Sequence, residues 1–311
     1  MKDFKGKLAI VTGGGTGMGR ELVRQLTAAG CHVATCDVSE ENMYETQRLC
    51  AQDSPSVRVT THLCDVADET QVLAFRDAAL KAHERDDINL LFNNAGIGGG
   101  ESFLINKREE WDRTFGVCWF GVYYCSRAFM PFLVASSEGY IVNTSSVNGF
   151  WAVTNTAYSA AKFAVKGFSE ALVTDLRMNA PHVKVAVVMP GHIGSSLAIN
   201  TDKVLGRPTP KDMSAADIAK IRRRMVESGM PGGNDSDEQI RAAIQQQLDD
   251  FSNKAPLSAG QAATIILDGV HNDRWRILVG DDAHAADKMV REAPEQVYEA
   301  DFRVALRKQL T

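Results

Sequence analysis

The sequence of 311 residues contains little cysteine, with no C-x-x-C pair and no Cys/His cluster at the spacing of a zinc site. This absence excludes a disulfide-stapled fold and a zinc module, and we expect no metal site. Free buried thiols are typical of a reducing compartment, so we expect the protein to be cytoplasmic. The six thiols in question are Cys31, Cys36, Cys50, Cys64, Cys118 and Cys125.

Positive charge is also not in excess. Lys and Arg number 34 against 39 Asp and Glu, which gives a formal net charge of −5. Nucleic-acid binding requires a surplus of Lys and Arg on one face, so we expect no nucleic-acid partner. No apolar run approaches the roughly 18–20 residues that span a bilayer. The N-terminal segment lacks the apolar core of a signal peptide, and we expect no membrane association.

Short β-branched runs alternate with longer amphipathic runs, at about the length of a βαβ unit, roughly 30 residues. Near-continuous apolar strands are typical of a sheet covered by helices on both faces. The pattern therefore predicts an α/β fold with a doubly wound parallel sheet of about seven strands. The predicted strands are 7–12, 32–36, 58–63, 88–92, 140–144, 183–189 and 276–279, and the predicted helices are 19–29, 40–52, 69–84, 107–135, 156–180 and 259–271.

Residues 195–256 interrupt this alternation between the sixth and seventh predicted strands. They carry no strand pattern, and we expect two helices there, at 215–228 and 236–251. A segment of this length is functional or partly disordered. We interpret it as a substrate lid, with a solvated helical appendage as the alternative. The chain 1–311 is then one domain with this insertion and a helical tail at 281–311, broken at Pro294.

A glycine-rich segment, Thr12-Gly-Gly-Gly-Thr-Gly-Met-Gly19, joins the first predicted strand to a helix. The spacing is T-G-x-x-x-G-x-G, and glycine lets the backbone approach a pyrophosphate at the N-terminus of the helix. Asp37 ends the second predicted strand, where a carboxylate can bind an adenosine ribose and repel a 2′-phosphate. No Lys or Arg lies between Gly13 and Gly19, so NAD is favoured over NADP.

Tyr158 and Lys162 are four residues apart in a predicted helix and therefore share one helix face. A phenol with a pKa of about 10 is a poor base unless a fixed cation stabilises the phenolate, which Lys162 can do. A surface pair of this kind occurs often by chance. Ser146 just beyond the fifth predicted strand favours a catalytic interpretation, because ligands bind at the carboxyl ends of parallel strands.

With these motifs, and with Asp65-Val66, Asn93-Asn-Ala-Gly96 and Pro190-Gly191, the sequence resembles a classical short-chain dehydrogenase/reductase from about residue 5 to 194, and more weakly from 257 to 280. The resemblance implies a Rossmann fold. It implies that Tyr158 is the general acid and base, that Ser146 binds the substrate oxygen, and that Lys162 holds the nicotinamide ribose and lowers the pKa of the tyrosine.

The cofactor-binding residues predicted in this way share a position along one trough. Asp65 would contact the adenine amino group with Val66 beside the ring, and Pro190, Gly191 and Ile193 would close over the carboxamide. The full set is Gly13, Thr16, Gly17, Met18, Gly19, Asp37, Val38, Asp65, Val66, Asn93, Ala95, Gly96, Tyr158, Lys162, Pro190, Gly191, Ile193 and Ser195.

The sequence departs from the family pattern at two places. Cys118 occupies the position of an Asn that, in relatives, is thought to distort its helix and hold a water of the proton relay. A thiol holds such a water poorly, so Cys118 is either a handicapped fourth catalytic residue or a small packed hydrophobe. Ser195 replaces the usual Thr after Pro190-Gly191 and keeps a hydroxyl.

The leading hypothesis is an NAD-dependent oxidoreductase that interconverts a secondary alcohol and a ketone. The alternatives are an NADPH-dependent carbonyl or acyl reductase, which Asp37 opposes, and a catalytically weak NAD-binding member. Apolar residues early in the insertion, together with Phe150 and Trp151, indicate a bulky apolar substrate. Helices 107–135 and 156–180 are apolar on more than one face, and in the family they form a dimer interface, so we expect a homo-oligomer, a dimer or tetramer.

Overall fold

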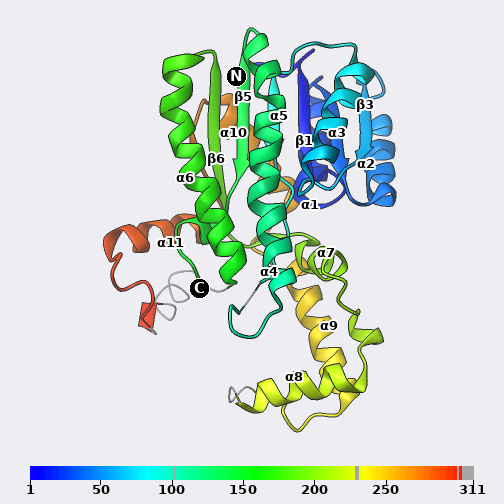
Figure 1. Ribbon diagram of the computed structural model, residues 1–311, viewed down its shortest axis with the longest axis vertical. Coiled ribbons are helices and arrows are strands. Elements are labelled where there is room, and N and C mark those ends of the chain that lie inside the picture. Colours follow the sequence, from blue (N-terminus) through cyan, green and yellow to red (C-terminus); the bar gives the residue numbers. More distant parts are fainter. Residues whose placement is uncertain (101, 154, 228–230, 300, 303–311) are drawn as a thin grey trace.

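The computed structural model describes residues 1–100, 102–153, 155–227, 231–299 and 301–302. Its centre is a parallel sheet of seven strands with helices on both faces (Figure 1). This confirms the predicted doubly wound α/β architecture, a Rossmann fold. Each predicted strand is present, with its ends shifted by at most two residues.

The strands are arranged in the order β3-β2-β1-β4-β5-β6-β9. The order reverses between β1 and β4, so the loops that follow these two strands diverge at the carboxyl edge of the sheet. Ligands bind at such a switch point in open α/β sheets. The bounds are β1 Leu8–Thr12, β2 His32–Asp37, β3 Val59–Leu63, β4 Leu90–Asn93, β5 Gly139–Thr144, β6 Val183–Pro190 and β9 Arg276–Val279.

Alternate residues of β1 enter two separate cores, because successive side chains of a strand point to opposite faces. Ala9 and Val11 belong to the core under α1 and α10, whereas Leu8 and Ile10 belong to the core under α3, α5 and α6. Figure 1 shows these three helices in front of the sheet and α10 behind it. The bounds are α1 Gly17–Ala28, α2 Glu40–Asp53, α3 Glu69–His83, α5 Gly121–Ala135, α6 Thr156–Asn179 and α10 Ala259–His271.

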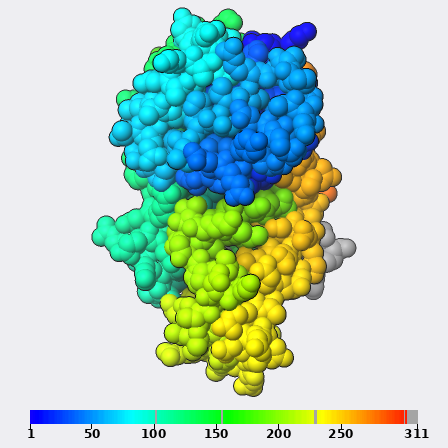
Figure 2. Space-filling model, turned by 90° about the vertical axis from the view of Figure 1, so that its right-hand side faces the viewer, coloured from blue at the N-terminus to red at the C-terminus, as the bar shows by residue number. Residues whose placement is uncertain are grey.

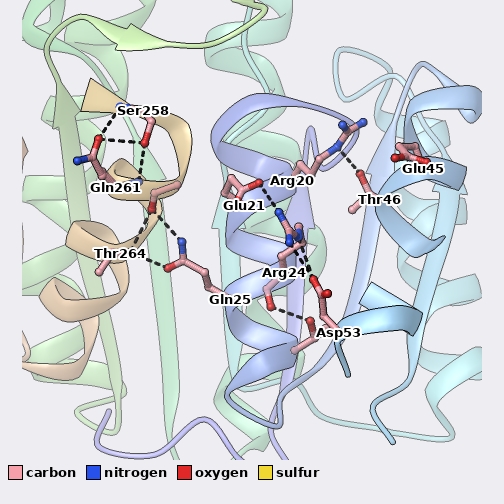
Figure 3. Close-up of polar contacts among 12 residues, drawn as sticks. Arg20, Glu21, Arg24, Gln25, Glu45, Thr46, Asp53, Ser258, Gln261 and Thr264 are labelled. Atoms are coloured by element: carbon pink, nitrogen blue, oxygen red, sulfur yellow. Dashed lines mark hydrogen bonds and ion pairs between the residues drawn. The ribbon is translucent and has the colours of Figure 1, made fainter. Parts of the chain in front are cut away.

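Polar contacts join the helices that cover the α1 face (Figure 3). Arg24 of α1 pairs with Glu21 on the same helix and with Asp53 at the end of α2, at 3.1 and 2.9 Å. Gln25 accepts a hydrogen bond from the Thr264 hydroxyl of α10 at 3.0 Å. Helix α10 follows the insertion in the chain, so these contacts fix the chain beyond the insertion against the first βα unit.

The helix predicted at 107–135 is one helical rod with a local change of winding. It consists of α4 Arg108–Phe115, a π-helical turn Gly116–Phe120 and α5. The rod Arg108–Ala135 is long and apolar enough to cross a membrane by length and composition alone, and half of its most apolar window is buried inside the molecule. Burial of that extent is typical of a core helix. All six cysteines are buried and free, as predicted.

The insertion begins and ends at two short paired strands, β7 Ile193–Gly194 and β8 Leu257–Ser258. Between them lie α7 Leu197–Val204, a 3-10 turn Pro210–Asp212, α8 Ala215–Glu227 and α9 Asp237–Asn253. These helices extend beyond the carboxyl ends of the sheet strands, and Figure 2 shows them, in green and yellow, below the blue N-terminal part. The two predicted helices are confirmed. Helix α8 agrees with the predicted helix 215–228 up to residue 227, after which residue 228 lies outside the described residues, and α9 corresponds to the predicted helix 236–251. Helix α7 was not predicted.

The tail begins with α11 Asp281–Glu292, which ends just before Pro294 as expected. Residues 303–311 of the predicted helical tail lie outside the described residues.

Candidate active site

The glycine loop between β1 and α1 can be built only with glycine at its key positions. Gly13 and Gly17 have φ angles of +69° and +54°. A Cβ on Gly13 would lie 2.8 Å from the Ala95 Cα, and one on Gly19 would lie 2.0 Å from the Gly13 carbonyl oxygen. Thr16, which precedes α1, makes no capping hydrogen bond to the helix. The N–H groups of the first turn are therefore available to an anion.

Asp37 ends β2 directly beside this loop. Its carboxylate accepts hydrogen bonds from the backbone N–H groups of Gly15 and Ser39, at 3.0 and 3.2 Å. Burial raises the pKa of Asp37, while these N–H groups and the nearby Arg20 oppose the shift. The Arg20 guanidinium is directed toward α2, where it donates to the Asn42 carbonyl and the Thr46 hydroxyl. Arg20 does not line the cavity described below.

Asp65 and Val66 follow β3 at the same edge of the sheet. Asp65 accepts a hydrogen bond from the Ala67 N–H at 3.0 Å and forms an ion pair with Arg113 of α4 at 2.6 Å. Arg113 has no motif that marks it as a site residue, because it is separated from Asp65 in the sequence by helix α3 and strand β4. Asp65 also lines the cavity described below, so its carboxylate is within reach of a ligand there.

Asn93 does not take the place in the site that the sequence predicted. It is the last residue of β4, and its buried amide donates to Ser126 and Asn143 at 3.0 and 2.8 Å. The next residue, Asn94, faces the glycine loop and donates to the Thr12 carbonyl at 3.1 Å. Side chains alternate at a strand end, which places Asn93 against α5 and Asn94 in the cavity.

Ser146, Tyr158 and Lys162 come together at the carboxyl ends of β5 and β6. The Ser146 hydroxyl accepts a hydrogen bond from the Asn148 N–H at 3.1 Å and also bonds the Tyr158 phenol. The buried Lys162 ammonium donates to the Thr144 carbonyl at 2.7 Å and lies 5.4 Å from the centroid of the Tyr158 ring. The side chains of Ser146, Tyr158 and Lys162 therefore lie together, as the sequence predicted.

Burial dominates the acid–base properties of this group. It raises the pKa of Tyr158, a shift that the hydrogen bond with Ser146 partly offsets. It lowers the pKa of Lys162. Both shifts favour the neutral forms, so an additional positive charge near the phenol would be needed to stabilise a phenolate.

Cys118 lies at the centre of the π-helical turn and is fully buried. Its thiol donates to the Ile97 carbonyl at 3.2 Å and accepts from the Ile97 N–H at 3.5 Å. A Cβ on Gly96 would lie between the Lys162 ammonium, at 3.6 Å, and this thiol, at 3.7 Å. Cys118 therefore supports the backbone beside Lys162 without lining the cavity itself.

The segment after β6 is fixed by a residue that the sequence pattern did not single out. Asp282, at the start of α11, accepts a hydrogen bond from the His192 N–H at 2.6 Å. A Cβ on Gly191 would lie 2.2 Å from the Asp282 carboxylate. The His192 ring contacts the ring of Phe251 in α9 with centroids 4.7 Å apart. These contacts join the insertion, the tail and the Pro190-Gly191 loop.

Phe150 and Trp151 do not line the site, contrary to the expectation from the sequence. The Trp151 indole donates to the Val297 carbonyl at 3.0 Å and packs edge-on against Phe302, with centroids 5.2 Å apart. Phe150 packs in the same cluster. The tail thus covers these two rings, and they anchor it instead of contacting a substrate.

A single cavity of about 600 Å³ brings the predicted residues together. It is lined by every predicted cofactor-binding and catalytic residue except Asn93 and Cys118. Asn94 also lines it, and the amide oxygen of Asn94 is buried with no hydrogen-bond partner in the described part of the chain. Residues of the insertion complete the lining, namely Ser196, Leu197, Asn200, Lys203, Val204 and Phe251.

This cavity fits a dinucleotide. The glycine residues let the loop pack closely beside the start of α1, which offers free N–H groups, and the buried Asn94 oxygen has no donor among the described residues. Among the described residues, no three His, Cys, Asp or Glu side chains form a group that could hold a metal ion. The fold and the site define a nicotinamide-dependent oxidoreductase.

The model of the short chain dehydrogenase family matches residues 7–204. The chain belongs to this family, whose members are NAD(P)-dependent oxidoreductases acting on CH–OH groups. The sequence is 33% identical over 293 residues, or 94% of this chain and 92% of the relative, to a Mycobacterium tuberculosis protein that carries the name oxidoreductase SadH.

Two solved structures are also similar. A short-chain dehydrogenase/reductase from Burkholderia phymatum in complex with NAD is 28% identical, with a TM-score of 0.76 and coverage of 95% of this chain and 96% of that chain. A metagenomic short-chain oxidoreductase in complex with NADP is 30% identical, with a TM-score of 0.56 and coverage of 60% and 83%. The similar structures thus include complexes of both nicotinamide cofactors.

Proposed function

We propose that this protein is an NAD-dependent oxidoreductase that interconverts a bulky apolar secondary alcohol and its ketone. The observation that carries the proposal is the convergence of Ser146, Tyr158 and Lys162 in the same cavity as Asp37 and the glycine loop. The first three groups handle the proton and the oxygen of a CH–OH group, and the others suit an adenosine and a diphosphate.

In the proposed mechanism, Ser146 holds the substrate oxygen and Tyr158 moves the proton of the hydroxyl. Bound NAD⁺ supplies the hydride acceptor. When protonated, Lys162 adds positive charge beside the phenol, and the positively charged ring of bound NAD⁺ would add the further charge that a buried phenolate needs. The same tyrosine donates its proton to the oxygen when the ketone is reduced.

The proposed preference for NAD over NADP is based on Asp37. Its carboxylate lines the cavity and is held by two N–H groups, so it cannot turn away from a bound adenosine without losing both hydrogen bonds. A ribose hydroxyl can donate to the remaining lone pairs, whereas a 2′-phosphate would meet a like charge. The nearest guanidinium, Arg20, is engaged with α2.

The proposal of an apolar substrate is based on the side of the cavity that the insertion lines. Leu197 and Phe251 of the insertion line the same cavity as Ser146 and Tyr158, together with Ile97 after β4. We interpret the insertion as a substrate lid, because α7 and the end of α9 contribute Leu197 and Phe251 from opposite ends of the segment. Binding of an apolar substrate becomes more favourable when such a lid removes its apolar surface from water.

The direct test is oxidation of a panel of secondary alcohols with NAD⁺ or NADP⁺, followed as reduced cofactor. We expect turnover of bulky apolar alcohols with NAD⁺.

Tyr158→Phe should lower turnover by roughly 10²–10⁴-fold, the range of general acid–base catalysis, while NAD⁺ still binds. A Tyr158→Phe variant that keeps more than about a tenth of the rate would contradict the proposed role.

We also propose a cytoplasmic homo-oligomer. Phe120 and Phe163 are 40% and 42% exposed on the two helices expected to form an interface, and Phe120 stacks on the partly buried Tyr124. Apolar surface of this kind marks an interaction site. Sedimentation of the purified protein should give a dimer or tetramer, and introducing a charge with Phe120→Glu should shift it toward the monomer.

The proposed cytoplasmic location is based on the buried free thiols, which are typical of a reducing compartment, and cell fractionation tests it.

A further inference from the structure

Helix α7 is fastened to both walls of the cofactor cavity. On one wall, the Asn200 amide donates to the Thr16 hydroxyl of the glycine loop at 2.8 Å. On the other wall, the Thr201 hydroxyl accepts a hydrogen bond from the Gly98 N–H at 2.7 Å. Because neighbouring residues of one short helix make these bonds, α7 joins the loops that follow β1 and β4, at the edge of the sheet where the cavity lies.

Close packing supports this placement. A Cβ on Gly99 would lie 2.7 Å from the Leu205 side chain just after α7, and a Cβ on Gly17 would lie 3.2 Å from the Ser195 Cβ just before it. Both ends of α7 therefore touch the loops that flank the cavity, and Figure 2 shows this part of the chain directly against the N-terminal βα units. Among the α7 side chains that line the cavity, Asn200 faces the glycine loop, whereas Leu197 lies near Gly98 on the other side.

The cationic side chains around the cavity differ in the partners that hold them. Within the described residues, the cationic side chains that line the cavity are Arg113, Lys162 and Lys203. Arg113 is paired with Asp65, and Lys162 donates to the Thr144 carbonyl. Lys203 is exposed and forms no ion pair within the described parts of the chain, and it lies three residues after Asn200 on the same side of α7.

We propose that the Lys203 ammonium binds the diphosphate of the dinucleotide from the α7 side, opposite the N-terminus of α1. This inference rests on the proposed function and assigns a cofactor contact to the insertion. The glycine loop contains no Lys or Arg, so Lys203 supplies the positive charge that the loop lacks. A charge-assisted bond to a phosphate oxygen is roughly twice as strong as a neutral one. Asn200 positions the helix by its bond to Thr16.

Binding of ADP-ribose and of adenosine to the full-length protein tests the proposal, because only the first carries the diphosphate. Lys203→Met should weaken ADP-ribose and NAD⁺ binding about tenfold and leave adenosine binding unchanged. Lys203→Arg should retain the affinity. The matched control is Lys211→Met, which removes the same charge from the same insertion at a residue that does not line the cavity. The control should bind ADP-ribose as the unmodified protein does.

Salt provides a second readout, since the affinity for ADP-ribose should fall less steeply with ionic strength in Lys203→Met than in the unmodified protein. Unchanged ADP-ribose affinity in Lys203→Met, an equal loss for adenosine, or a loss confined to ligands with a 2′-phosphate would each overturn the diphosphate contact. If the unmodified protein binds neither ADP-ribose nor NAD⁺, the proposed function itself fails, and this result is distinct from the others.

Discussion

Cys118 illustrates how one side chain can replace another in a fixed backbone setting. The π-helical turn at Gly116–Phe120 is present although no Asn occupies its centre. The thiol bonds both the N–H and the carbonyl of Ile97, which is what a side-chain amide could also do at this place. The winding of the helix is therefore compatible with cysteine, and the thiol differs from an amide mainly in holding a water weakly.

Cys118→Asn should consequently fold, bind NAD⁺ and raise the proton-linked rate of alcohol oxidation. The reason is that the amide can bond Ile97 and still orient a water near Lys162. The measurement is turnover against pH in H₂O and D₂O, with a larger solvent isotope effect in the unmodified protein than in the variant. Cys118→Ala, which cannot bond Ile97, should be no faster. A Cys118→Asn variant that turns over no faster at any pH would exclude a handicapped relay.

Asp37 gives the second prediction at this scale. The unmodified protein should prefer NAD⁺ over NADP⁺ by at least about tenfold, equivalent to ~1.4 kcal/mol, because the carboxylate repels a 2′-phosphate. Asp37→Ala should narrow this ratio mainly by improving NADP⁺ binding. Calorimetric titration with both cofactors measures it, and Asp53→Ala, on the outer end of α2, serves as the control. Equal affinities in the unmodified protein would show that Asp37 does not select the cofactor.

At the scale of elements, the edge strand β3 and helix α3 meet at a cluster of histidines. His83 of α3 and His62 of β3 both hydrogen-bond the Thr60 hydroxyl at 3.0 Å, and the His32 ring of β2 lies 6.4 Å from that of His83. Burial, together with the charges of His32, Arg58 and His62, lowers the pKa of His83 from 6.5 to about 4. The native contact between β3 and α3 therefore needs a neutral imidazole.

The unfolded chain binds more protons than the native protein between these two pKa values. Stability should therefore be lost as the pH falls from 6.5 to about 4. His83→Gln keeps a partner for Thr60 but cannot titrate, so its free energy of unfolding should depend less on pH in this interval. Urea unfolding at pH 5 and pH 7 measures the difference, with the exposed His284→Gln as control. An identical pH dependence in His83→Gln and the unmodified protein would contradict this origin.

For the whole molecule, the insertion and the tail enclose the site from two sides. If the insertion is a lid, amide exchange in α7 and around Phe251 should slow when NAD⁺ and the best alcohol of the panel are both bound, because these segments line the cavity. Helix α8 does not line the cavity and should exchange at an unchanged rate. The same protection of α7 in the free and ternary states would favour a fixed appendage over a lid.

The sequence was sufficient for features that depend on neighbours in the chain. Apolar runs located the central sheet strands, because these are buried on both faces, and the edge strand β3 was located by its β-branched residues although it is only partly buried. The spacing of Gly13, Gly17 and Gly19 identified the loop since only glycine tolerates its φ angles and close contacts. Helix α7 escaped prediction because eight residues are too few to show a clear helical period.

By itself, then, the sequence determined the parallel α/β sheet, the glycine loop and the positions of Ser146, Tyr158 and Lys162 along the chain, since local pattern and strand order suffice for these. The tertiary structure decided which neighbouring residue faces the cavity, as with Asn93 and Asn94. It also decided that Trp151 anchors the tail at Val297 and that α7 closes onto Thr16. These pairs are 146 and 184 residues apart, and such contacts depend on how whole elements pack, which no local pattern encodes.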